Sequence, residues 1–141
     1  ASVLERAGFP GERMVVELTE ASLSRGLANG TVDRLGSVGV RFAAIDFGAG
    51  AITPAELRRI PMAYVRVSLG GLSIDDAYDL GLVRSVVAAA DALGITVLGD
   101  GIETDEQLEL ANRAGIGLVQ GYRWGSPGPL AKLSSTWARL P

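Results

Sequence analysis

Residues 93–129 read LGITVLGDGIETDEQLELANRAGIGLVQGYRWGSPGP, and this stretch decides the fold. Two short apolar runs, residues 95–98 and 117–119, flank one segment with helical character. Thr104 and Gln107 have the spacing of a capping box, which predicts the start of that helix. A strand–helix–strand unit of this kind implies two parallel strands joined by a right-handed crossover.

Each of the two predicted strands ends in a polar residue followed by glycine, Asp100-Gly101 in the first and Gln120-Gly121 in the second. The carboxyl ends of adjacent parallel strands meet at one edge of a sheet and commonly line a site. Asp100 and Gln120 could equally be ordinary turn residues, because polar residues at strand ends are frequent turn formers. The spacing alone leaves both interpretations open.

The same strand and helix alternation extends back through the chain. Further strands are predicted at residues 14–19, 41–46 and 63–68, and helices at 31–37, from Thr53 to Pro61, at 83–93 and at 130–140, with a further helix start at 73–76. Regular alternation of this kind indicates an α/β protein with about five parallel βα units. A parallel sheet is covered on both faces or closed into a barrel, and five units are too few for the usual eight-stranded barrel. Either the sheet is open and doubly wound, or it is the later part of a (β/α) barrel.

The composition suits one globular domain, residues 1–141, with 48% hydrophobic and 21% charged residues. A net charge of −3 argues against a nucleic-acid surface. The sequence contains no Cys and no His, so only oxygen ligands are available, and these suit Mg²⁺ or Mn²⁺. No apolar run reaches the roughly 20 residues of a membrane span, and no signal peptide is evident, so we expect a cytoplasmic protein.

Charged and polar residues lie in or just after all five predicted strands: Glu17, Asp46, Arg66, Asp100 and Gln120. In a barrel these residues would converge on one face. Carboxylates grouped there without histidine would hold a hard divalent cation, which serves phosphate-ester chemistry. The alternative is a set of salt bridges, for instance between Arg66 and Asp46 or Asp100, because buried charges are normally paired.

Five motifs in order resemble the carboxyl-terminal portion of the EAL domain, the bacterial signal-transduction phosphodiesterase that cleaves cyclic di-GMP. They are VVELTE (15–20), AIDFGAG (44–50), YVRVS (64–68), VLGDGIET (97–104) and VQGYRWGSPGP (119–129). The resemblance implies a TIM-type (β/α)8 barrel with one antiparallel strand, of which this chain would supply the last five strands.

The resemblance also implies a role for several side chains. Glu17 falls on a metal-ligand carboxylate, and Asp46 falls beside the metals, the substrate and the attacking water. Glu103 falls on the residue that positions the Gly-rich loop. Gln120, with Gly121 beside it, falls on the lining of the substrate pocket. The expected cofactor is Mg²⁺ or Mn²⁺.

The departures from the family pattern concern the chemistry itself. Ile45 stands where the family has a metal-ligand Asp, and an aliphatic side chain cannot coordinate a cation. Arg66 replaces the catalytic Lys, which keeps the charge but changes the geometry. Asp100 replaces the active-site Glu and is one methylene shorter. The Glu-Ala-Leu motif and the metal-binding Asn, which precede these strands in the family, do not occur in this sequence.

Three hypotheses follow. The first is a truncated, degenerate EAL-type module with a regulatory or interaction role and residual cyclic di-GMP affinity. The second is an active metal-dependent cyclic di-GMP phosphodiesterase completed by an upstream segment or a partner chain, which Ile45 argues against. The third is a purely structural assembly module. Five strands leave two open edges, so we expect a homodimer or pairing with the missing amino-terminal strands. The resemblance implies a second dimer-contact region around residues 49–59.

Overall fold

The structure is a computed structural model that describes residues 2–45 and 53–129 of the 141. Its centre is one sheet of five parallel strands in the order β1-β2-β3-β4-β5. The strands are β1 (Val15–Thr19), β2 (Arg41–Ile45), β3 (Met62–Ser68), β4 (Thr96–Asp100) and β5 (Leu118–Val119). The predicted strands are therefore confirmed, and so is their sequential parallel order.

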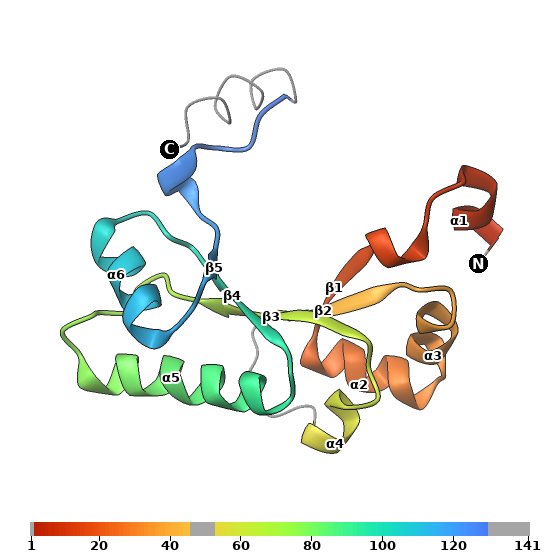
Figure 1. Cartoon of the computed structure of the whole chain (residues 1–141), viewed down its shortest axis with the longest axis horizontal. Helices are drawn as coiled ribbons and strands as arrows, with labels where there is room; N and C mark the ends of the chain where they lie inside the picture. The colour runs from red at the N-terminus through yellow and green to blue at the C-terminus, as the bar shows by residue number, and fades with distance from the viewer. Residues whose placement is uncertain (1, 46–52, 130–141) are drawn as a thin grey trace.

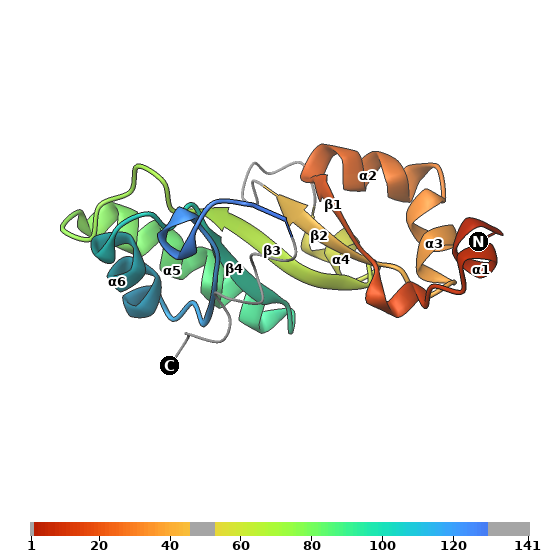
Figure 2. The same ribbon diagram turned by 90° about the horizontal axis from the view of Figure 1, so that it is seen from above.

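Helices and short 3-10 turns connect the strands. The helices are α1 (Ser2–Ala7), α2 (Glu20–Ala28), α3 (Thr31–Gly36), α4 (Pro54–Leu57), α5 (Ala77–Ala92) and α6 (Asp105–Ala114), and the 3-10 turns are η1 (Gly11–Arg13) and η2 (Tyr122–Trp124). Figure 1 shows α2, α4 and α5 together on one side of the sheet. Seen from above in Figure 2, α2 and α3 lie at the β1 end, and α5 and α6 at the β4 end.

Local sequence signals explain most of the helix starts. Thr104 and Gln107 form the predicted capping box: each backbone N–H donates to the other's side chain, at 3.0 Å from Thr104 and 3.3 Å from Gln107. Helix α5 joins the helix start predicted at residues 73–76 to the helix predicted at 83–93, because Asp76 caps it by accepting from the Tyr78 N–H. Pro61 does not end the preceding helix as predicted, because α4 already stops at Leu57.

Helix α2 was not predicted. Thr19 is its N-cap and accepts from the Ser22 N–H at 3.3 Å, and Leu23 and Leu27 occupy one face of the helix. Gly26 and the serines of this segment have low helix propensity, which conceals the helical pattern in the sequence. Packing of the two leucines, which are 0% and 7% exposed, compensates for that low propensity.

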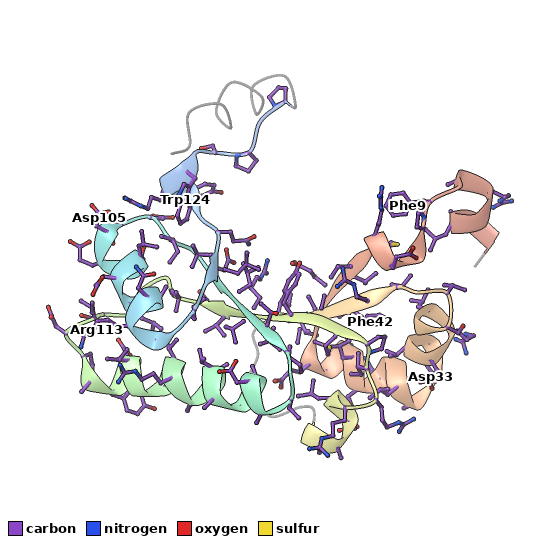
Figure 3. The ribbon with its side chains drawn as sticks, viewed as in Figure 1. Phe9, Asp33, Phe42, Asp105, Arg113 and Trp124 are labelled. Atoms are coloured by element: carbon purple, nitrogen blue, oxygen red, sulfur yellow. The ribbon has the colours of Figure 1, made fainter. Side chains whose placement is uncertain are left out.

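The hydrophobic core lies between the sheet and its helices. Phe42 and Ala44 of β2, Val65 of β3 and Val97 of β4 alternate along their strands and point to the helices. They pack with Leu110 of α6 and other buried residues: Leu23, Leu27, Val83, Ala90 and Ile102. Figure 3 shows Phe42 on the side of the sheet where α2 lies.

Among the described residues, no helix covers the middle of the opposite face of the sheet (Figure 1). The register places Glu17, Ala43 and Tyr64 in one row across β1, β2 and β3, and Arg66 beside Leu98 of β4. Since neighbouring residues along a strand point to opposite faces, these residues point away from the core that contains Val65. This face therefore presents the polar residues of the strands.

Within residues 2–45 and 53–129 no helix has the length and apolar character needed to cross a membrane. Two predicted features lie outside the described residues: Asp46 with its Gly-rich loop, and the expected helix at residues 130–140.

Candidate functional site

Glu17 is held by two side chains of β3. The Tyr64 hydroxyl donates to Glu17 Oε1 at 3.0 Å, and Arg66 Nη1 lies 3.2 Å from Glu17 Oε2, within hydrogen-bond distance. Both oxygens of this carboxylate are thus engaged from β3, two strands away across β2. The Glu17 side chain is 37% exposed and that of Arg66 is 26% exposed, so the pair lies at the edge of solvent.

Arg66 also faces a second carboxylate, across the β3–β4 boundary. Its Nε lies 3.6 Å from Asp100 Oδ2. The other oxygen of Asp100 accepts from Gln120 Nε2 at 2.9 Å and from the Gly101 N–H at 2.8 Å. One continuous polar network therefore runs from β1 to the end of β5, with the guanidinium of Arg66 between the two carboxylates.

The structure brings together four of the residues that the sequence singles out: Glu17, Arg66, Asp100 and Gln120. The salt-bridge alternative, which the sequence leaves open, describes the observed Arg66–Asp100 pair. Asp46 lies outside the described residues, so its predicted place near this network stays a prediction.

Tyr64 belongs to this network and was missed by the sequence reasoning. Partial burial raises the pKa of its hydroxyl, and the hydrogen bond to Glu17 and the negative charge of that carboxylate raise the pKa further. Tyr64 therefore stays protonated and able to donate throughout the neutral range. The available signal was its spacing, because residues two apart in a strand share a face and Tyr64 is two residues before Arg66.

The described residues do not fit a divalent cation. Arg66 already supplies a positive charge between Glu17 and Asp100, and Ile45, at the end of β2, offers no donor. Among residues 2–45 and 53–129 no three or more acidic, His or Cys side chains are grouped so that they could hold a metal ion. A cation entering between these carboxylates would have to displace the guanidinium.

Glu103 and Gly121 follow the β4 and β5 ends. Glu103 is exposed, and its backbone N–H donates to Gln107 Oε1 at 2.7 Å. The loop that it is predicted to position lies outside the described residues. Gly121 packs so closely that a Cβ there would overlap the backbone of Ile102. The Ile102 N–H donates a hydrogen bond to the Gln120 carbonyl, and the Ile102 carbonyl accepts one from the Arg123 N–H. Glycine at this position lets the β5 end approach β4, and that approach sets the position of Gln120.

An ion pair links the segment that follows Gly121 to α6. Arg123 Nη1 lies 2.7 Å from Asp105 Oδ1, which joins η2 to the first turn of α6. Figure 3 shows Asp105 and Trp124 on this same flank of the molecule. The pair is exposed at the Asp105 side, so we assign it an orienting role and little stability.

A comparison with protein-family models matches residues 1–127 to the EAL domain. The chain belongs to the EAL domain family. Its sheet is accordingly part of a TIM-type barrel, as the resemblance implies, and the open doubly wound alternative is wrong. The five βα units correspond to the last strands of the EAL barrel.

Relatives and solved structures agree with this assignment. The EAL-type chain is 32% identical over 134 residues to the cyclic di-GMP phosphodiesterase NbdA of Pseudomonas aeruginosa, covering 92% of this chain and 17% of NbdA. It superposes with TM-score 0.80 and 27% identity on the P. aeruginosa MucR phosphodiesterase in complex with c-di-GMP, over 94% of this chain and 55% of that one. A Klebsiella pneumoniae BlrP1 complex with manganese and cyclic di-GMP matches with TM-score 0.68 and 29% identity, over 86% of this chain and 32% of that one. The chain thus spans about a fifth of the length of MucR and of NbdA.

Proposed function

We propose that this EAL-type chain is a cyclic di-GMP signalling module that binds the dinucleotide but does not hydrolyse it, with a regulatory or interaction role. Its relatives include cyclic di-GMP phosphodiesterases, and its structural neighbours include EAL domains in complex with cyclic di-GMP. These likenesses support the ligand class. The loss of hydrolysis rests on the chain's own residues.

The observation behind this proposal is the guanidinium of Arg66 between the carboxylates of Glu17 and Asp100. Metal-dependent hydrolysis needs a divalent cation that lowers the pKa of a bound water and neutralises phosphate charge. Arg66 supplies positive charge but cannot generate a metal-bound hydroxide.

The remaining roles belong to the same proposal. Gln120 and Gly121 line the nucleotide pocket, Asp46 lies beside it, and Glu103 positions the Gly-rich loop. Any affinity for Mg²⁺ or Mn²⁺ is weak.

The proposal also covers the setting of the chain, residues 1–141, as one degenerate EAL-type domain in the cytoplasm. The outer edges of β1 and β5 pair with no described strand. Unpaired strand edges favour association, so pairing with a second copy, or with further barrel strands, would cover them.

We predict no measurable hydrolysis of cyclic di-GMP by this chain. The reason is the absence of a fitting cation site among the described residues, together with Ile45 at a ligand position. The chain and cyclic di-GMP are incubated with Mg²⁺ or Mn²⁺, and the nucleotides are separated by chromatography. The MucR phosphodiesterase is the positive control. A linear dinucleotide that forms at a metal-dependent rate would contradict the proposal and favour the active-enzyme hypothesis.

A further inference from the structure

The pairing of β2 with β3 contains an irregularity next to the site. Phe42 pairs with Met62, but the next residue, Ala43, pairs with Tyr64, so Ala63 is an extra residue in β3. An extra residue in a strand changes which face the following side chains point to. Met62 accordingly packs against the core, whereas Tyr64 and Arg66 point to the opposite face.

A small residue separates Tyr64 from its partner. Glu17 and Tyr64 lie two strands apart, about 10 Å between backbones, and Ala43 is the residue between them in the same row. Ala43 is 0% exposed. Because its side chain is a single methyl group, the ring of Tyr64 can extend across β2 and reach Glu17 Oε1. A larger residue in this row would obstruct that path.

Arg66 completes the contact from the next position on the same face. It engages the second oxygen of Glu17 at 3.2 Å and directs Nε to Asp100. Two side chains of one strand thus occupy both oxygens of Glu17, and one of them places a fixed positive charge beside it. We call Tyr64 and Arg66 together the β3 clamp.

We propose that the β3 clamp is an internal replacement for a metal ion, and that Arg66 excludes divalent cations from Glu17 and Asp100. This inference rests on the proposed function, because it explains how the site is kept free of metal. Arg66 Nη1 and Nε each engage an oxygen of one of the two carboxylates, and the Tyr64 hydroxyl engages the other oxygen of Glu17, so an incoming dication would have to displace side chains that already occupy these oxygens. Removing the guanidinium should therefore turn the pair into a weak divalent-cation site.

The test measures Mn²⁺ binding directly, without activity. Free Mn²⁺ is followed by electron paramagnetic resonance as the full chain is added. We expect no saturable binding by the unaltered chain. For Arg66→Met we expect saturable Mn²⁺ binding with an affinity at least about tenfold above the limit of detection, because removing a charge next to the site changes the binding free energy of a dication by more than a tenfold change in affinity requires. Arg66→Gln provides a second neutral variant.

Two control variants make the result specific. Arg84→Met removes one positive charge from α5, where Arg84 bonds to the carbonyl of Arg113, and should bind no Mn²⁺. Adding Glu17→Gln to Arg66→Met should abolish the gained binding. Circular dichroism and thermal melting check that each variant is folded.

The outcomes separate this inference from the proposed function. Binding of Mn²⁺ by the unaltered chain that Glu17→Gln removes would overturn the clamp. So would folded Arg66→Met and Arg66→Gln variants that bind no more Mn²⁺ than the unaltered chain. Hydrolysis of cyclic di-GMP by the unaltered chain would instead contradict the proposed function, whatever the Mn²⁺ titration of Arg66→Met gives.

Discussion

Replacing Phe42 with alanine is expected to lower the free energy of unfolding by about 3–5 kcal/mol. Phe42 is 0% exposed and is the largest fully buried side chain among the described residues. It stands in β2 at the middle of the sheet and packs within the core cluster on the helix side. Truncation removes the transfer free energy of the ring and leaves a cavity that the close-packed surroundings fill only in part.

Chemical denaturation followed by circular dichroism measures this effect. Phe9→Ala is the matched control, because Phe9 is 46% exposed, and we expect a change within about 0.5 kcal/mol. A loss below about 1 kcal/mol for Phe42→Ala would show that the helix-covered face of the sheet is not the chain's core.

Gly121→Ala is expected to destabilise the chain by about 1–3 kcal/mol and to displace the β5 end. A Cβ at this position overlaps the backbone of Ile102, and a backbone obstacle cannot rotate away as a side chain does. Relief of the overlap must move Gly121 outward. The bond from the Ile102 N–H to the Gln120 carbonyl, 3.1 Å long, would then lengthen, and the Gln120 side chain would lose its position on Asp100.

Hydrogen exchange at the Ile102 amide, read together with a denaturation curve, tests this. Gly117→Ala is the control, because a Cβ at Gly117 would meet no atom within 4 Å. We expect faster exchange at Ile102 in Gly121→Ala alone. Equal exchange and equal stability in the two variants would mean that the close approach of β5 to β4 does not depend on glycine.

The βα alternation was readable from the sequence because each strand is short, apolar and followed by a turn residue. The strand order then follows from the right-handed crossover, and the capping box of Thr104 and Gln107 is local enough to be read directly. The convergence of Glu17, Arg66, Asp100 and Gln120 follows from the same rule, since residues near the carboxyl ends of parallel strands share one edge.

Other features could not be read in this way. Helix α2 depends on the packing of Leu23 and Leu27 in the core, and this packing cannot be inferred from the helix propensities of the local sequence. The extra residue at Ala63 depends on how β3 pairs with β2, and alternation along MAYVRVS alone would put Met62 on the face of Arg66. The bond from Tyr64 to Glu17 crosses a whole strand and follows only from the register. Choosing the barrel over an open sheet required the family resemblance, because five βα units fit both.

Under the proposed function, the departures from the family pattern that the resemblance implies form a consistent set. If Ile45 stands at a ligand position, a bound divalent cation would have fewer oxygen ligands, and the negative charges of Glu17 and Asp100 would need another partner. Arg66 compensates both carboxylates at once, which a lysine ammonium, a point charge without a planar fork, does less well.

The central claim is tested most directly by calorimetric titration of cyclic di-GMP into the chain, with and without Mn²⁺. The account predicts a saturable binding isotherm that is the same under both conditions, with intact cyclic di-GMP recovered from the cell. Binding that appears only with Mn²⁺, continuing heat accompanied by linear dinucleotide, or no binding under either condition would contradict it.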